Sequence, residues 1–224
     1  MAQHPIPRPE YPRPQMVRDA FLNLNGTWDF SFDFSNSGID RKYQLEENFE
    51  RTITVPFCPE SKLSGIGFTD FIPALWYKRT FTLPEEALNG HVLLHFGAVD
   101  YRCKVWVNDV ECGGHQGGYT SFAIDITEAA KAGENKVVLW AEDDGRSCTQ
   151  PRGKQSSKYY SHGCDYTRTT GIWQTVWIEW VPSTYIDSYR VIPDRRNGKV
   201  TLKASIKGCT KNAVLTASAS FDGK

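Results

Sequence analysis

The stretch between Arg152 and Trp180 contains many side chains that could bind a ligand. They are Lys154, Lys158, Tyr159, Tyr160, His162, Asp165, Tyr166, Arg168 and Trp173. Aromatic rings stack on the C–H faces of sugars, while carboxylate and guanidinium groups form directional hydrogen bonds with sugar hydroxyls. Long loops without regular secondary structure are often functional. This stretch therefore favours a saccharide ligand, although its residue types do not distinguish one sugar from another.

Other clusters of reactive residues are explained more simply by local structure. The acidic run at 142–145 fits a strand end followed by a turn better than a catalytic carboxylate cluster. Two close Cys/His pairs lack the four-ligand pattern of a structural zinc site; they are Cys112 with His115 and His162 with Cys164. The glycine-rich segment 113–118 lacks the strand, lysine and helix of a phosphate-binding loop, so we interpret it as a flexible connector. We expect no metal and no cofactor in this chain.

Composition and charge exclude several other classes of protein. The chain of 224 residues has 26 Lys plus Arg and 26 Asp plus Glu, so it carries no net charge that would favour nucleic acid or an anionic membrane. Its amino terminus lacks the apolar core of a signal peptide and no run is long enough to span a bilayer, which predicts a soluble, cytoplasmic protein. The six cysteines follow no disulfide framework, and we expect them to be reduced.

Hydrophobic alternation predicts a chain built of β-strands. From Asn25 onward apolar residues recur at every second position, as a strand with one solvated face requires. The pattern marks strands at 28–32, 77–81, 92–96, 103–107, 122–126 and 137–141. Turn-forming residues such as Asn108-Asp109 and Asp144-Gly145 separate them, and helical periodicity is limited to a turn or two at 85–88 and 128–131. We therefore expect an all-β fold with antiparallel sheets.

The two ends of the chain differ from this central part. Residues 1–15 carry five prolines and predict an extended arm that lies across a surface. The segment 171–181 is apolar on both parities, which predicts a strand covered on both faces. After Pro182 the residues become smaller and more polar, with three more strands predicted at 185–193, 199–206 and 213–220. These final 42 or so residues are fewer than half of the ~100 in an immunoglobulin-like sandwich. We expect open sheet edges there, and pairing between chains in a homo-oligomer.

Eight short motifs in order suggest a family. They are Leu24-Asn-Gly-Thr-Trp-Asp-Phe30, Thr54-Val-Pro-Phe57, Trp76-Tyr-Lys-Arg-Thr-Phe81, Leu94-His-Phe-Gly-Ala-Val-Asp100, Val105-Trp-Val-Asn108, Gly118-Tyr-Thr-Ser-Phe122, Asn135-Lys-Val-Val138 and Asp165-Tyr-Thr-Arg-Thr-Thr-Gly-Ile-Trp173. From about residue 11 to 182 the chain resembles the N-terminal domain of family 2 glycoside hydrolases, which include β-galactosidases, β-glucuronidases and β-mannosidases. The resemblance implies a jelly-roll β-sandwich of the galactose-binding type over 1–182, an incomplete immunoglobulin-like domain over 183–224, and a TIM barrel that is absent here.

The resemblance also implies a function. In that family two barrel glutamates hydrolyse terminal β-glycosides with retention, their carboxyl groups ~5 to 5.5 Å apart, so this fragment would be non-catalytic. It would lend substrate-binding carboxylates at the positions of Asp165 and Asp70, with Arg168 and Tyr166 in support, while Trp173 would belong to the core. The expected parent is β-galactosidase-like, with a β-glucuronidase or β-mannosidase as the alternative. Its partners would be a terminal β-linked hexose and the remainder of its own chain. A stand-alone carbohydrate-binding module and an oligomer-forming scaffold are two further hypotheses.

Overall fold

The structure is a computed structural model that describes residues 6–208 and 213–220. The chain divides into two compact units, Met1–Trp180 and Val181–Lys224. Within the described ranges no helix is long and apolar enough to cross a membrane. The only helical segments described are three short 3-10 turns, η1 (Tyr43–Leu45), η2 (Lys62–Ser64) and η3 (Glu85–Asn89), so one of the two expected turns, at 85–88, is a 3-10 helix.

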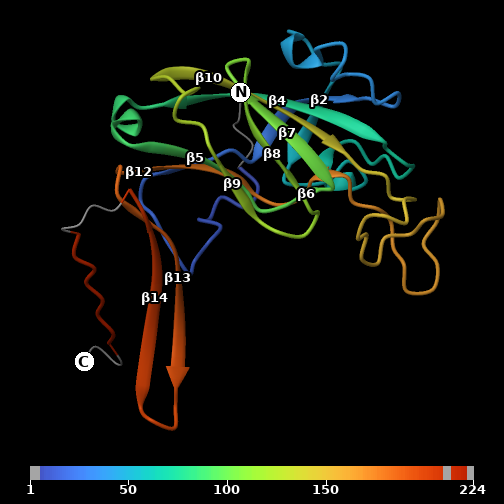
Figure 1. Ribbon diagram of the computed structural model, residues 1–224. Coiled ribbons are helices and arrows are strands. Elements are labelled where there is room, and N and C mark those ends of the chain that lie inside the picture. The colour runs from blue at the N-terminus through green and yellow to red at the C-terminus, as the bar shows by residue number, and fades with distance from the viewer. Residues whose placement is uncertain (1–5, 209–212, 221–224) are drawn as a thin grey trace. The chain divides into compact units, whose positions relative to one another are not determined.

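Two sheets form the first unit (Figure 1). In spatial order the larger sheet contains β3 (Arg51–Val55), β2 (Gly26–Phe32), β4 (Ala74–Leu83), β10 (Gly133–Glu142), β7 (Arg102–Val107) and β8 (Val110–Gln116). The smaller sheet contains β1 (Phe21–Asn23), β12 (Val176–Val181), β5 (His91–Phe96) and β9 (Phe122–Asp125). A short pair joins β6 (Val99–Asp100) to β11 (Gly171–Ile172). The registers recorded between neighbouring strands are antiparallel.

The core lies between the two sheets. The larger sheet contributes Trp28, Phe30, Tyr77, Val105 and Leu139, and the smaller one contributes Leu94, Phe96, Ile124, Val176 and Ile178, all in one buried cluster. In β2 the buried Trp28 and Phe30 alternate with the exposed Thr27 and Asp29, because successive side chains of a strand point to opposite faces. The apolar residues at alternate positions in the sequence are therefore those that face the core of this sandwich. The expected all-β class is confirmed.

The larger sheet is also covered on its outer face. Trp76, Trp106 and Trp140 form a second buried cluster with Ala74 and Val138, and Ile39, Tyr43 and Phe49 pack against it. The segment that carries η1 therefore shields the outer surface of β4, β10 and β7. This cover explains why five consecutive residues from Ala74 to Lys78 are buried, where a strand with one solvated face would bury every second one.

Three expectations about strands are corrected by the structure. The glycine-rich segment 113–118 is not simply a connector, because Gly113 and Gly114 lie within β8 and pair with β7. A Cβ atom at Gly114 would meet the carbonyl oxygen of Cys103 at 2.3 Å, so only glycine allows this close pairing. The predicted strand at 171–181 is interrupted, since β11 and β12 are separated by residues 173–175. The predicted strand at 213–220 is not formed in the structure.

The proline-rich arm is fixed to β12 through one buried carboxylate. The Glu179 side chain is 0% exposed and accepts hydrogen bonds from Tyr11 Oη at 2.5 Å and from Arg13 Nη2 at 3.0 Å. Arg18 Nε lies 2.8 Å from the other carboxylate oxygen, and Trp177 Nε1 donates at 2.9 Å. The arm therefore packs on the smaller sheet through an ion-pair network that satisfies a charge buried there.

The second unit is a β-hairpin followed by an irregular segment. Strands β13 (Tyr185–Asp194) and β14 (Lys199–Lys207) pair in an antiparallel register with one irregularity between Ile186 and Ser188. Asp194 Oδ1 accepts from the backbone N–H groups of Arg196 and Asn197 and so closes the turn between the strands. Apolar side chains such as Val191 and Val200 are exposed on this hairpin. Of the six cysteines, the five in described residues are free, and Cys209 lies outside them.

Candidate functional site

A loop of residues 143–170 connects β10 to β11 and extends away from the sandwich at the right of Figure 1, in yellow to orange. Its regular structure is limited to isolated bridges between Gln155 and Tyr166 and between His162 and Asp165. The structure places three of the sequence-predicted site residues, Asp165, Tyr166 and Arg168, on this loop. The fourth, Asp70, lies on the neighbouring loop that precedes β4.

Asp165 lies at the base of a tight hairpin. Its backbone N–H donates to His162 O at 2.8 Å, and the His162 N–H donates back to Asp165 O at 3.0 Å. The Asp165 side chain is 24% exposed and its Oδ2 lies 3.8 Å from His162 Nε2. The carboxylate is therefore not sealed in the interior, and it is accessible to a hydroxyl group. The next residue, Tyr166, pairs through its backbone with Lys154 and Ser156 and is 61% exposed.

Asp70 is exposed and makes one local contact, in which its Oδ1 accepts from the Phe71 backbone N–H at 2.7 Å. This contact orients the carboxylate. Among the described residues, Asp70 Oδ2 accepts no hydrogen bond. Asp70 thus both stabilises its turn and presents an acceptor to solvent.

Arg168 joins the two loops. Its guanidinium donates to the carbonyl oxygens of Ser156 at 3.1 Å and Lys158 at 2.5 Å in the long loop, and also to Thr69 O beside Asp70. Its Cζ lies 4.1 Å from the centroid of the Phe71 ring, and the residue is 3% exposed. Arg168 therefore positions the loops that carry Asp70 and Asp165. Among described residues it forms no ion pair with either carboxylate.

Buried polar residues anchor the base of the long loop. Gln155 Nε2 donates to Asp100 Oδ2 at 2.7 Å, and Gln155 Oε1 accepts from the Thr169 N–H at 2.7 Å. Gln150 Nε2 donates to Asp143 Oδ1 at 2.6 Å. The Thr170 N–H donates to a Glu60 oxygen at 3.3 Å, and its hydroxyl to Asp143 Oδ2 at 3.4 Å. The carboxyl groups of Asp100, Asp143 and Glu60 thus accept hydrogen bonds from side chains and a backbone N–H group of the loop.

Burial changes the protonation of these three carboxyl groups. Removal from water raises the pKa of Asp100 to about 7, and the neighbouring charge of Asp143 adds to this effect. Burial likewise raises the pKa of Glu60 to about 7 and that of Asp143 to about 6. The loop is therefore held by groups that change charge near neutral pH.

Sequence reasoning missed this buried cluster. The acidic run at 142–145 was interpreted as a strand end and a turn, but Asp143 is buried and bonds the loop. The missed signal is parity, because Val137, Leu139 and Ala141 point into the core and Asp143 continues the same parity beyond the strand. Asp100 and Glu60 carry no local signal, since only the fold brings them together.

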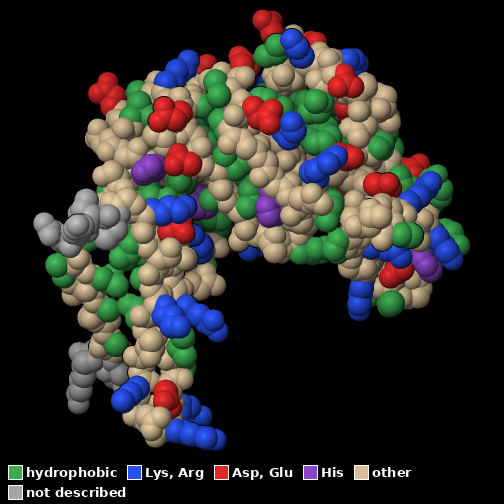
Figure 2. Space-filling model, in the orientation of Figure 1, with side chains coloured by type: hydrophobic (Ala, Val, Ile, Leu, Met, Phe, Trp, Pro, Cys, Tyr) green, Lys and Arg blue, Asp and Glu red, His purple; other side chains and the backbone are tan. Residues whose placement is uncertain are grey.

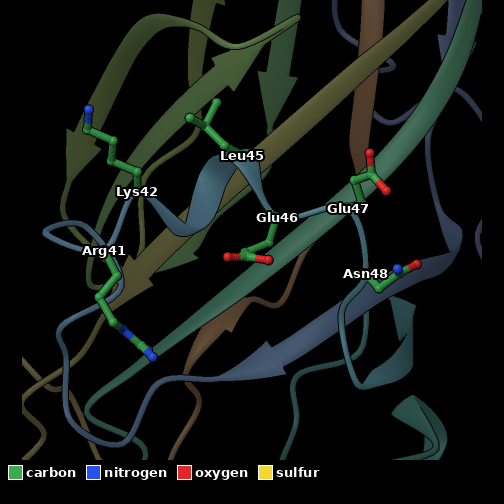
Figure 3. Close-up of a pocket in the computed structure, with 6 residues that line it drawn as sticks. All are labelled: Arg41, Lys42, Leu45, Glu46, Glu47 and Asn48. Atoms are coloured by element: carbon green, nitrogen blue, oxygen red, sulfur yellow. The ribbon is translucent and has the colours of Figure 1, made fainter.

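Two surface hollows lie away from Asp70 and Asp165, while a smaller one of about 230 Å³ borders the long loop at Asp144, Ser147 and Gln150. A cleft of about 940 Å³ runs between the arm and the sandwich and is lined by Tyr11, Arg13, Phe57, Trp173 and Trp177 among others. Trp173 is half-buried, lies between β11 and β12 and lines this cleft. The prediction that it belongs to a strand and to the core is therefore wrong. A shallower hollow of about 460 Å³ lies on the segment 41–48, and its side chains point in different directions (Figure 3). Neither Asp70 nor Asp165 lines these hollows, and the described residues hold no cluster of three or more potential metal ligands.

Together the fold and the loops define a class of protein: a two-sheet β-sandwich that presents carboxylates on long loops at one end. Residues 21–182 match the family described as "Glycosyl hydrolases family 2, sugar binding domain". The chain therefore belongs to this family, and the resemblance noted in its motifs is confirmed.

Curated relatives include enzymes of two specificities. The chain is 30% identical over 148 residues to a β-glucuronidase of Paenibacillus borealis, covering 64% of this chain and 24% of that protein. It is 27% identical to the β-glucuronidase of Homo sapiens, covering 88% and 34% respectively. It is 28% identical to a β-galactosidase of Thermoanaerobacter pseudethanolicus, covering 83% and 24%. The chain thus spans between a quarter and a third of the length of these relatives.

Solved structures share the fold. A Ruminococcus gnavus β-glucuronidase in complex with uronic deoxynojirimycin superposes with a TM-score of 0.68 at 24% identity. The match covers 88% of this chain and 36% of that one. At this level of identity the likeness establishes the shared β architecture.

Proposed function

We propose that this chain is the sugar-binding part of a retaining exo-β-glycosidase whose catalytic residues lie in a further domain. The observation that supports it is the pair of loops joined by Arg168, each of which presents a carboxylate that is not sealed from solvent, on a family 2 sugar-binding domain. The length of the relatives supports the second half of the proposal, since each is about three to four times as long as the region it shares with this chain.

In this proposal Asp165 and Asp70 hold the terminal sugar. An ionised carboxylate can accept two hydroxyl hydrogen bonds at once, which fixes both the position and the rotation of the ring. A ring held in this way reacts faster, because positioning converts a bimolecular encounter into an effectively unimolecular step. Contacts that shorten in the transition state raise the catalytic rate as well as the affinity. Arg168 contributes indirectly, by keeping the two loops at a constant separation.

The parent enzyme would act on terminal β-glycosides. The sequence analysis favoured a β-galactoside, and relatives that act on glucuronides and galactosides both share this domain. Both substrates present equatorial ring hydroxyls to a carboxylate, and they differ in the C6 substituent and at C4.

Two assays test the proposal. The chain of 224 residues should release no nitrophenol from nitrophenyl β-galactoside or β-glucuronide, since in this proposal the nucleophile and the acid–base group both belong to another domain. In the full-length enzyme, Asp165→Asn should reduce kcat/KM by roughly 10²- to 10³-fold, as loss of a preorganised charged contact does. Asp40→Asn serves as the control because Asp40 is exposed and distant in sequence from both loops. Turnover by the isolated chain, or equal kinetics for the two variants, would contradict the proposal.

A further inference from the structure

Asp165 faces a histidine across the tight hairpin of the long loop. His162 and Asp165 are opposite each other in an antiparallel bridge, and each donates its backbone N–H to the carbonyl oxygen of the other. Opposite residues of an antiparallel pair place their side chains on the same face. Gly163, with a φ of 55°, allows the tight turn between them. The hairpin therefore holds the imidazole and the carboxylate side by side.

Further contacts fix the ring of His162. Its Nδ1 lies 3.0 Å from the hydroxyl oxygen of Ser156, a fully buried residue. The ring of Tyr160 meets the imidazole edge to face, with 6.1 Å between the two centroids. Ser156 is itself fixed, because its backbone N–H donates to Tyr166 O at 2.7 Å and its carbonyl oxygen accepts from Arg168 at 3.1 Å. The imidazole is thus oriented before any ligand binds.

The hydrogen bonds of Ser156 indicate which ring nitrogen of His162 carries the hydrogen. The serine hydroxyl has a single hydrogen, which it donates to the Tyr160 carbonyl oxygen at 2.8 Å. The same hydroxyl oxygen accepts from the Lys158 backbone N–H at 3.1 Å. Toward His162 the hydroxyl can therefore only accept, so Nδ1 carries the hydrogen. In the neutral ring Nε2 then has a free lone pair.

This free nitrogen faces a carboxylate with which it makes no hydrogen bond. His162 Nε2 lies 3.8 Å from Asp165 Oδ2, which is longer than a hydrogen bond, and both atoms are acceptors. The two side chains are 31% and 24% exposed, respectively. Among the described residues the Asp165 carboxylate accepts no hydrogen bond, so both acceptors are open to a ligand. Such a pair is best satisfied by a ligand that brings two donors.

The surroundings of the pair suit a sugar. Figure 2 shows acidic, basic and histidine side chains close together at the right of the first unit, where the long loop lies in Figure 1. Tyr160 and Tyr166, which neighbour the pair in the chain, are 64% and 61% exposed and offer apolar faces to a pyranose ring. Hydroxyl groups on adjacent ring carbons present two donors side by side. One hydroxyl alone cannot satisfy both acceptors, because it has one hydrogen.

We infer that His162 is a further sugar-binding residue of this site, and that its Nε2 and the Asp165 carboxylate accept from two adjacent hydroxyl groups of one sugar ring. The inference rests on the proposed function and deepens it, because it adds a residue that determines specificity. A sugar that lacks either hydroxyl leaves one of the two acceptors without a donor, which weakens its binding. The site thus selects sugars in which both adjacent hydroxyls are present.

Nitrogen NMR tests the position of the hydrogen and the contact with the sugar. The 224-residue chain is labelled with ¹⁵N-histidine, and long-range ¹H–¹⁵N spectra are recorded at pH 8 with and without methyl β-D-galactoside. The spectrum of His162→Asn identifies the signals of this ring. In the free chain Nε2 should have the shift of a nitrogen without hydrogen, and added sugar should move it toward that of a hydrogen-bonded nitrogen. A hydrogen on Nε2 in the free chain, or an Nε2 shift that the sugar does not change, would overturn the inference.

Monodeoxy sugars test whether two hydroxyls are recognised. Affinities for methyl β-D-galactoside and its 2-, 3- and 4-deoxy analogues are measured with the natural chain and with His162→Asn. Asparagine keeps a donor for Ser156 but is too short to reach the position of Nε2. The natural chain should bind two analogues, which lack adjacent hydroxyls, roughly three- to tenfold more weakly than the parent sugar. In His162→Asn one of these two penalties should disappear and the other should remain.

A second histidine provides the matched control. His91→Asn removes an imidazole whose Nδ1 lies 2.8 Å from Asp125, away from the long loop, and should keep both penalties. Thermal unfolding of each variant checks that the fold is intact. The same penalties in His162→Asn as in the natural chain, or the loss of a penalty in His91→Asn as well, would refute the contact.

Asp165→Asn separates this inference from the proposed function. If Asp165→Asn abolishes binding while His162→Asn keeps both penalties, the proposed function stands and the inference fails. If Asp165→Asn leaves the affinity unchanged, or the natural chain binds no sugar, both fail, because the inference pairs the histidine with that carboxylate.

Discussion

Arg168 holds two loops together almost entirely through backbone carbonyl groups. Three carbonyl oxygens accept from its guanidinium, and the Phe71 ring packs against its flat face. This geometry requires a planar group with several fixed donors, and lysine has neither property. The sequence analysis predicted a supporting role for this residue, and its contacts explain how such support would operate.

Arg168→Lys should loosen both loops without unfolding the sandwich. A lysine can serve one or two of the three carbonyl groups, and each buried acceptor left unpaired costs about 1–3 kcal/mol. We expect faster cleavage by trypsin after Lys154 and Lys158 and a lower free energy of unfolding. Arg146→Lys is the control, because Arg146 donates to no backbone carbonyl recorded in the described chain and stacks on the same ring. Equal rates of cleavage in the two variants would contradict the positioning role.

Glu179 is the second residue whose environment determines its behaviour. Burial alone would raise its pKa, but His95, whose Nε2 lies 3.4 Å from Glu179 Oε2, and the hydrogen bonds from Tyr11 and Trp177 outweigh burial and lower the pKa to about 2. A carboxyl group with a lowered pKa stabilises the fold above its unfolded pKa, and this contribution is lost as pH falls toward 2.

Glu179→Gln should therefore destabilise the first unit and release the arm. The amide has no charge to balance Arg13 and Arg18, and removal of one member of a buried ion pair costs about 3–5 kcal/mol. Denaturant titration at pH 7 measures the loss, and hydrogen exchange of residues 11–18 reports detachment of the arm. Glu134→Gln, at an exposed position, should change neither. A loss below about 1 kcal/mol would show that the network contributes little.

At the scale of elements, the loop 143–170 depends on carboxyl groups beneath it. Burial raises the pKa values of Asp100 and Glu60 to about 7 and that of Asp143 to about 6. Each carboxyl group therefore binds its proton more tightly in the folded chain than in the unfolded one. Their stabilising contribution is full below the unfolded pKa near 4 and is lost as pH rises through 6 to 7.

The free energy of unfolding should consequently fall between pH 5 and pH 8. With one pKa unit corresponding to 1.36 kcal/mol, a single group shifted this far accounts for about 2 kcal/mol across that window. Asp100→Asn is isosteric, keeps an acceptor for Gln155, and removes one titrating group. The variant should show a flatter pH profile and greater stability than the natural chain at pH 8. A profile unchanged by the substitution would contradict the assignment.

A glycine at the end of the loop shows how closely this region is packed. Gly171 has a φ of 71°, and a Cβ atom there would lie 2.5 Å from Tyr77 Oη and 2.9 Å from a Leu75 methyl carbon. Gly133 has a φ of 82°, and a Cβ atom there would have no heavy atom within 4 Å outside its chain neighbours.

Alanine substitutions at these two glycines separate strain from packing. Gly133→Ala should cost about 1 kcal/mol for the left-handed backbone alone, and Gly171→Ala should cost about 1–3 kcal/mol more because the core must move. Thermal unfolding of the two variants gives the difference. Similar losses at both positions would show that the packing around Tyr77 adapts without cost.

Strands could be predicted where one face is apolar and the other polar. They could not be predicted where tertiary packing overrides the hydrophobic pattern. Trp28, Phe30 and Phe32 alternate with polar residues, so β2 could be read directly from the sequence. Strand β8 could not, since Gly113 and Gly114 are turn residues by type and become strand only through pairing with β7. The predicted strand at 213–220 failed for the opposite reason, because the described residues offer it no partner strand and alternation alone does not form a sheet.

At the scale of the whole molecule, the sequence and the structure agree on a sandwich that belongs to the family 2 sugar-binding domains. Family motifs spread over 24–173 predicted this architecture, and the first compact unit of the structure ends at Trp180. The buried carboxyl groups beneath the loop were not predictable, since Glu60, Asp100 and Asp143 lie far apart in sequence. The catalytic domain of the parent belongs to our proposal, and the immunoglobulin-like domain stays a prediction.

The most direct test of the account maps a single sugar onto the chain. Methyl β-D-galactoside and methyl β-D-glucuronide are titrated into the ¹⁵N-labelled chain, and amide shifts are recorded for each residue. We predict that the largest shifts fall on 68–71 and 162–168, the segments that carry Asp70 and Asp165, and that Asp165→Asn abolishes them. Shifts confined to the cleft beside Trp173, or none in the two loops at saturating sugar, would contradict the claim that these carboxylates bind the substrate.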